Sequence, residues 1–288
     1  MAIISPQAYC LLAGPDKGHG YGALPAQLVA MENAIATQDP VAASTLNRHL
    51  CRALLEQFTL TGSPWNLPEK FELLYEQQRR RIATNVIAKP DDYFSFANDP
   101  FRKDLAILRH RLIPCGAEFA TPFSGISRTL LLAGGWRQGI KFIRVIVHCG
   151  GIKPFLELHM HPQCIDAFNP EGWLDTYENL ADFLIANPSF LGVQSTSWFL
   201  DPALEQVSPH LSYLRRTPEN CGAAILYAGD DDPQHSGAFA TSKSRRVLYA
   251  AGHYRPRLFT RIWPRQRLLQ RSWRGLPPDW DERRADSS

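Results

Sequence analysis

The chain has 288 residues, of which 44% are hydrophobic and 20% charged, with a formal net charge of +3. This composition excludes an intrinsically disordered chain, and no window approaches the ~18 uninterrupted apolar residues of a membrane-spanning helix. The cysteines form no C-x-x-C pair, so we expect reduced thiols and a cytoplasmic protein without a cleaved signal peptide. They are Cys10, Cys51, Cys115, Cys149, Cys164 and Cys221.

The first part of the chain predicts a flexible arm followed by helices. Residues 1–22 are rich in glycine, which favours the arm. Residues 23–116 form the helical region. Asp39-Pro40, Ser63-Pro64 and Asp99-Pro100 each place a capping residue before proline, and apolar residues follow at helical spacing. We expect the last of these helices to continue until Pro114.

Residues 117–275 predict a mixed α/β domain, and residues 276–288 a frayed tail. A β-branched run at 140–148, then Gly150-Gly151, then 155–161 indicates a β-hairpin. An amphipathic helix closed by Asn187-Pro188 follows, with helical stretches after residue 201. Further strands are expected at 191–200, 223–227 and 257–263. The predicted class is therefore α+β, with an N-terminal helical layer and a mixed sheet with flanking helices.

Positive charge concentrates near the C-terminus. Residues 242–275 contain ten basic and no acidic residues; without them, 21 basic and 28 acidic residues remain, a net charge of −7. Nine of the ten are arginine, which binds phosphate and carboxylate through forked hydrogen bonds. The segment predicts either an anion-binding face or arginines that pair with the acidic remainder of the chain.

The most informative short segment is the expected strand 155–161. Because side chains alternate along a strand, Glu157, His159 and His161 share one face. A carboxylate beside imidazoles suits general acid–base catalysis near neutral pH. The alternative structural interpretation is that both histidines are hydrogen-bonded at the rim of a packed surface.

Metal binding is a second interpretation of the same residues. His159 and His161 form a His-x-His pair, and Asp166 follows at a spacing that resembles the cupin pattern, with Cys164 as a further candidate ligand. Cupins carry Glu where this chain has Asp166, and no second cupin motif follows. Nucleotide-binding glycine loops, the G-x-S-x-G nucleophile motif and H-E-x-x-H are all absent from the sequence.

Three segments resemble a set of uncharacterised bacterial proteins over roughly the last 150 residues. They are 159–173, the run Ser197-Trp-Phe-Leu-Asp-Pro-Ala-Leu204 with its continuation to Arg215, and Ala240-Thr-Ser-Lys-Ser-Arg-Arg246 with its continuation to Arg265. The order of elements is also similar to the second half of GNAT acyltransferases. In that family, two strands that splay apart beside a helix form a slot for the pantetheine arm.

The GNAT resemblance implies a set of site residues. Glu157, His159 and His161 would provide the base and Tyr213 the general acid. Cofactor-binding residues would be Ser195, Ser197, Arg245, Arg246 and Arg255. The family's glycine-rich pyrophosphate loop is replaced here by residues 164–172, where Asp166 and Glu171 would repel phosphate.

The predicted function is therefore an acyltransferase-like enzyme with no firmly bound cofactor. It would use acyl-CoA or a carrier-bound acyl thioester as donor and act on a small-molecule substrate. An acidic carrier protein is the expected partner; no membrane partner is expected, and nucleic acid is disfavoured. The alternatives are a metal-dependent oxygenase or hydrolase, and a non-catalytic module that binds an acidic protein or nucleic acid.

Overall fold

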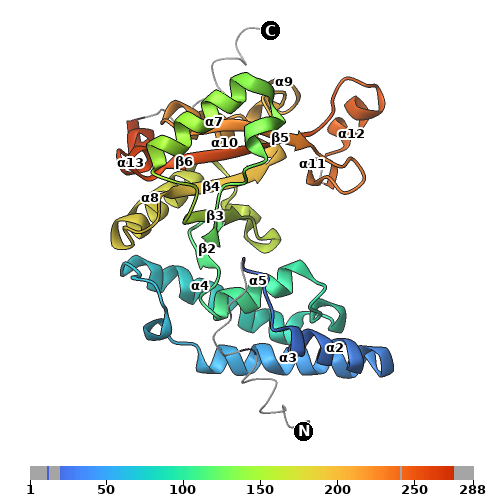
Figure 1. The fold of residues 1–288 in the computed structure, drawn as a ribbon. Coiled ribbons are helices and arrows are strands. Elements are labelled where there is room, and N and C mark those ends of the chain that lie inside the picture. Colours follow the sequence, from blue (N-terminus) through green and yellow to red (C-terminus); the bar gives the residue numbers. More distant parts are fainter. Residues whose placement is uncertain (1–11, 13–19, 241, 276–288) are drawn as a thin grey trace. The chain divides into compact units, whose positions relative to one another are not determined.

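A computed structural model describes residues 12, 20–240 and 242–275 (Figure 1). The contacts between residues divide the chain into two compact units. The first comprises 1–124 together with 159–168, and the second comprises 125–158 together with 169–288. The predicted tail 276–288, and most of the predicted arm 1–22, lie outside the described residues.

The first unit is mainly helical. Its helices are α2 (Ala26–Gln38), α3 (Pro40–Gln57), α4 (Lys70–Ala88) and α5 (Asp99–Leu108), with short 3-10 turns η1 (Leu60–Gly62), η2 (Asp91–Tyr93) and η3 (Pro162–Ala167). Strands β1 (Ile113–Pro114) and β2 (Phe119–Ser124) pair antiparallel. The Asp39 carboxylate caps α3 by accepting from the N–H groups of Val41 and Ala42, which confirms the predicted start of that helix.

Two boundaries in this unit differ from the prediction. Helix α4 begins at Lys70 and not at Ser63. The Ser63 hydroxyl accepts the N–H of Trp65 in a local turn, and the Pro68 carbonyl accepts the N–H of Phe71 at the start of the helix. Helix α5 ends at Leu108 and not near Pro114. His110 adopts a left-handed backbone (φ 53°), and the N–H groups of Arg111 and Leu112 both bond the Ala106 carbonyl, which closes the helix.

The second unit contains a mixed sheet. Strands β3 (Phe155–His159), β4 (Gly192–Ser197), β6 (Arg257–Pro264) and β5 (Ala224–Asp230) lie in that order. The β3–β4 pair is parallel, whereas β4–β6 and β6–β5 are antiparallel. The sheet and its helices confirm the predicted α+β class, and three of its strands match the predicted segments 191–200, 223–227 and 257–263.

Helices cover both faces of this sheet. On one face, Phe142 and Val145 of α7 (Gly135–Cys149) form a core with Phe155, Leu226 and Ile262. On the other face, Tyr177 of α8 (Pro170–Ala186) meets Trp263 of β6 and Trp273 edge-on. The shorter elements of the unit are α6 (Leu130–Ala133), η4 (Trp198–Leu200), α9 (Leu204–Val207), η5 (Pro209–Leu211), α10 (Tyr213–Asn220), α11 (Gly237–Ala240), α12 (Lys243–Ala250), α13 (Arg265–Leu269) and η6 (Ser272–Gly275).

The predicted β-hairpin is wrong. Residues 140–148 belong to helix α7, whose buried positions Gly139, Phe142 and Val145 recur at intervals of three. Gly150 is the left-handed residue that ends this helix (φ 80°), and it is not a hairpin turn. The second predicted strand, 155–161, ends at His159, because Met160 uses its carbonyl to bind Lys103 and Pro162 has no N–H to donate.

Candidate functional site

The parallel strands β3 and β4 share only a short ladder. Its described pairs are Leu156 with Val193 and Glu157 with Gln194. Strand β4 continues through Ser195, Thr196 and Ser197, which pair on their other side with β6. Helix α8 connects the two strands along the chain. The edge of β4 that follows Gln194 therefore extends beyond the described ladder with β3.

The residues around this edge point to different faces of the sheet. Ser195 pairs in register with Arg261, whose guanidinium lies 5.2 Å from the centre of the Trp173 ring of α8. Glu157 pairs with Gln194, which lies opposite Ile262 of the core under α7. Ser195 and Ser197 thus face α8, while Glu157 lies on the α7 face. Ser195 is buried, and Ser197 and Glu157 are half-buried.

His159, the last residue of β3, belongs to the first unit and contacts other residues of that unit. Its ring lies 4.5 Å from the Tyr21 ring, in an edge-on arrangement. Burial, together with the positive charge of Lys103, lowers the pKa of His159 to about 4. The imidazole is therefore neutral at physiological pH, which is the form that can accept a proton.

An ion pair lies beside this histidine. The Lys103 ammonium is 2.6 Å from a carboxylate oxygen of Asp99 and donates to the Met160 carbonyl at 2.7 Å. The Tyr21 hydroxyl donates to the other Asp99 oxygen at 2.6 Å. Burial opposes ionisation of Asp99, but the hydrogen bonds from Lys103 and Tyr21 outweigh it and lower its pKa. Tyr21, Asp99, Lys103 and His159 form one group, which we call the His159 cluster.

His161 belongs to a different group, deep in the first unit. It is fully buried, and its Nε2 lies 3.4 Å from Oδ1 of the buried Asp104. Asp104 also accepts hydrogen bonds from Arg81 and Tyr93, both at 2.6 Å. Burial raises the pKa of Asp104, but the bonds from His161 and Tyr93 and the charge of Arg81 overcome it, so the pKa lies below its usual value.

The structure therefore divides the predicted Glu157/His159/His161 row. Glu157 and His159 share a face of β3, whereas His161 lies beyond the strand and contacts Asp104. Among the described residues, no three His, Cys, Asp or Glu side chains come together to hold a metal ion, so His159, His161 and Asp166 do not converge. Burial raises the pKa of the Cys164 thiol, which keeps it protonated.

The other predicted site residues are dispersed over the second unit. Arg245 is buried, donates to the Ala238 carbonyl and the Ser208 hydroxyl, and lies over the Trp198 ring. Arg246 donates to the Phe239 carbonyl, and the exposed Arg255 lies 3.7 Å from Asp230. Tyr213 is the buried first residue of α10.

Several C-terminal arginines form ion pairs with acidic residues of the second unit. Arg257 donates to the buried Asp201 at 2.8 Å. Arg271 pairs with Glu178 and Asp182 of α8, and Arg274 also pairs with Glu178. These contacts match the alternative in which the arginines neutralise acidic residues of the same chain.

The start of α8 offers no glycine-rich phosphate loop. The Asn169 side chain caps the helix by accepting the N–H of Gly172, with Pro170 at the first position and Glu171 in the first turn. The acidic first turn disfavours a phosphate group at this helix end.

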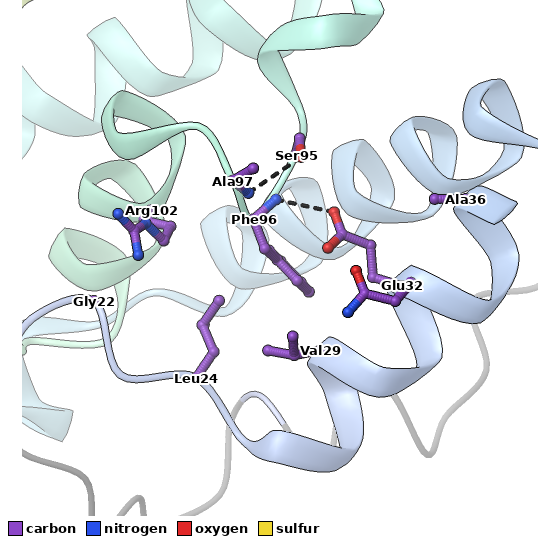
Figure 2. A pocket seen from close by; sticks show the side chains of 10 residues that line it. Gly22, Leu24, Val29, Glu32, Ala36, Ser95, Phe96, Ala97 and Arg102 are labelled. Atoms are coloured by element: carbon purple, nitrogen blue, oxygen red, sulfur yellow. Dashed lines mark hydrogen bonds between the residues drawn. The ribbon is translucent and has the colours of Figure 1, made fainter.

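The first unit also contains a pocket of about 450 Å³, a size suited to a small molecule (Figure 2). Val29, Glu32 and Ala36 of α2 line it together with Phe96 and Arg102. Figure 2 shows the Glu32 carboxylate accepting the Phe96 N–H, and Glu32 also accepts from Asn47. None of the site residues predicted from the sequence lines this pocket.

The partners of both histidines were not predicted from the sequence. Tyr21, Asp99 and Lys103 contact the 159–160 segment, and Arg81, Tyr93 and Asp104 surround His161. One signal was present: Lys103 and Asp104 lie between the apolar residues Phe101 and Leu105 of the helix, and both are buried. Charged residues that a helix buries are normally paired, which would have pointed to α5.

No protein-family model matches the chain, and no curated protein matches it. Two solved structures show limited similarity. One is an acyltransferase in complex with decanoyl-CoA, 16% identical, with a TM-score of 0.38 and 85% of each chain covered. The other is an acyltransferase in complex with CoA and 10C-Teicoplanin, 15% identical, with a TM-score of 0.35, covering 90% of this chain and 94% of that one. At these TM-scores the similarity supports no inference about this chain.

Proposed function

We propose that this protein is a GNAT-like acyltransferase that takes an acyl group from CoA or from a carrier-bound thioester. The observation that carries the proposal is the short β3–β4 ladder, which covers two described residue pairs although both strands continue beyond it. A strand edge that continues past its neighbour can pair with an extended ligand that carries amide groups. The pantetheine arm of these donors is such a ligand.

The edge at Ser195–Ser197 is the proposed pantetheine site. The amides of the arm would pair with the backbone of β4, and the Ser195 and Ser197 hydroxyls would be available on the α8 face. Arg245, Arg246 and Arg255 are the proposed phosphate-binding residues. Because Asp166 and Glu171 carry negative charge near the start of α8, a carrier-bound donor, which brings one phosphate where free CoA brings three, suits this site better than free CoA.

Glu157 or His159 is the proposed base, and Tyr213 the proposed acid. The base removes a proton from the acceptor's N–H or O–H group as that atom attacks the thioester carbonyl. The new C–N or C–O bond forms, the C–S bond breaks, and Tyr213 gives its proton to the departing thiolate. The neutral state of His159 is compatible with the role of base.

The test measures acyl-group loss from both donors. The wild-type protein would be incubated with acyl-CoA and with an acylated carrier protein in the presence of a set of amines and alcohols, and free thiol and acylated product would be quantified. Glu157→Gln and His159→Gln would be compared, and the variant that lacks the base should lose about 10²–10⁴-fold in kcat while donor binding is retained.

Glu219→Gln is the matched control. Glu219 lies near the C-terminal end of α10, whereas Tyr213 is the first residue of that helix, so this variant should keep full activity. The proposal fails if neither donor binds and no acyl product forms. It also fails if both base variants retain wild-type kcat.

A further inference from the structure

Helix α7 has an exposed apolar face in addition to its buried one. Trp136, Ile140, Ile143 and Val147 recur at intervals of three or four residues and are 42–75% exposed, while Phe142 and Val145 face the core. Leu132 of α6, 81% exposed, precedes them. Exposed apolar residues scattered singly need no explanation, but a continuous row on one helix marks an interaction surface.

A row of positive charge runs along the same helix. Arg137, Lys141 and Arg144 are exposed and follow one another at intervals of four and three, beside the apolar row. The Arg137 guanidinium lies over the Trp136 ring, and Lys141 donates to the Ile225 carbonyl. The sequence contains no acidic residue between Glu118 and Glu157, whereas Arg128 and Lys153 add two more exposed cations.

The positive charge of α7 indicates which kind of partner its exposed apolar face would bind. None of the arginines of α7 forms an ion pair with another described residue, and each is exposed. A partner of negative charge would therefore neutralise the row, whereas a neutral apolar partner would leave cations at its border. Complementarity of charge and of apolar area points to an anionic, amphipathic surface.

We propose that α7 is a membrane-surface helix that binds anionic lipid headgroups. Its apolar row would enter the boundary between headgroups and acyl chains, with Trp136 at one end, and its arginines would contact lipid phosphates. The row consists of apolar side chains bordered by cations, which suits the apolar and anionic layers of a lipid surface.

This proposal departs from the expectation of no membrane partner, which rested on the lack of a long apolar window in the sequence. Within the described part of the chain, no helix has the length and hydropathy to cross a bilayer. A helix that lies in the interface needs neither, because its backbone remains hydrogen-bonded internally and only one face is inserted. The proposal is also independent of acyl transfer.

The test is cosedimentation of the full chain with vesicles. One set contains phosphatidylcholine and phosphatidylglycerol, and the other phosphatidylcholine alone. The wild-type chain should bind the anionic vesicles, weakly bind the neutral ones, and be released by salt. Trp136→Ser with Ile143→Gln should weaken binding about tenfold or more, and so should Arg137→Gln with Arg144→Gln.

Matched controls are Ile87→Gln on α4 and Arg52→Gln on α3, which alter an exposed apolar residue and an exposed cation elsewhere. Both should bind like the wild-type chain. The proposal is overturned if the wild-type chain does not bind anionic vesicles, or if the α7 variants bind as well as the controls. It is also overturned if the α7 variants convert a dimer to a monomer while vesicle binding is unchanged, which would assign the face to a second copy.

Discussion

His159 illustrates how a single side chain can be kept neutral by its surroundings. Removal from water disfavours the imidazolium ion, and the Lys103 ammonium adds repulsion, while Asp99 acts in the opposite direction. The lysine is fixed by its bonds to Asp99 and the Met160 carbonyl, so its charge stays close to the histidine. The proton-accepting form of His159 is thus maintained mainly by burial, and the neighbouring cation adds to this effect.

Replacing this lysine should change the titration of His159 in a defined direction. In Lys103→Met the repulsion is lost and Asp99 remains, so the pKa of His159 should rise above about 4 but stay below the usual value of a histidine, because burial is the larger cause. NMR titration of the ring protons measures this shift. Lys89→Met serves as control and should leave the titration unchanged; a fall in pKa in Lys103→Met would contradict the electrostatic explanation.

For single residues, the sequence predicted which side chains share a face of β3, but it did not predict what those side chains contact. The alternation of Leu156 and Leu158 with Glu157 and His159 was correct, because strand geometry fixes it over neighbouring residues. The contact of His159 with Tyr21 joins residues that are far apart in the chain, and no local pattern encodes it. The separate placement of His161 follows from the end of β3, which depends on the same distant lysine.

Strand β4 begins at a position that only glycine can occupy. Gly192 has φ +155°, and a Cβ atom there would lie 2.2 Å from the Trp263 carbonyl oxygen of β6. Because this neighbour is backbone of the paired strand, it cannot rotate away. The close approach of β4 and β6 at Pro264 therefore depends on the missing side chain.

We expect Gly192→Ala to lower the free energy of unfolding by more than about 2 kcal/mol, because the β4–β6 pairing has to shift to admit a methyl group. Urea denaturation followed by circular dichroism measures the change. Gly62→Ala is the control, since its Cβ would have its nearest neighbour at 3.5 Å, and it should stay within about 0.5 kcal/mol of the wild type. Equal stability of the two variants would contradict this account.

Helix α3 and strand β6, whose sequences favour one kind of element, were predicted correctly. Helix α7, whose sequence has features of both a strand and a helix, was not. Helix α3 was located by its Asp39 cap, and β6 by its run of strand-forming residues. In α7, β-branched residues favoured a strand, although Phe142, Val145 and Cys149 follow a helical period. The exposed Ile143 and Val147 obscured this period, because they place apolar residues on a second face of the helix.

At the scale of the whole molecule, the segment 159–168 is separated in the chain from the rest of its unit. His161 is near Asp104, and the Gln163 side chain accepts hydrogen bonds from Arg81 at 2.7 Å and Asn85 at 2.8 Å. These polar contacts, buried at His161 and partly buried at Gln163, join the segment to α4 and α5. Sequence reasoning could not foresee this, because the predicted helical region was a continuous stretch of chain.

The stability of this unit should depend on pH through Asp104. The pKa of Asp104 in the folded protein lies below the usual value of an aspartate, so the ionised form stabilises the fold above that usual value, and its contribution is lost as pH falls through the lowered pKa of the folded state. Asp104→Ala should lower the free energy of unfolding by about 3–5 kcal/mol at neutral pH, because Arg81 loses its buried partner. Urea unfolding at several pH values measures both effects.

The difference in free energy of unfolding between the wild type and Asp104→Ala should become smaller at acidic pH. Asp92→Ala, at an exposed position, is the control and should change stability by no more than about 0.5 kcal/mol. A difference that is independent of pH down to strongly acidic solution would show that the carboxylate charge is not what stabilises the network.

The return of residues 159–168 to the first unit has a consequence for how the molecule can be assembled. The backbone passes from one unit to the other after residues 124, 158 and 168, so no single cut yields both units whole. A ribosome that has made helices α2 to α5 has not yet made His161 and Gln163. The buried Asp104 of α5 therefore lacks its partner His161, and Arg81 and Asn85 lack Gln163, until the beginning of the second unit has been synthesised.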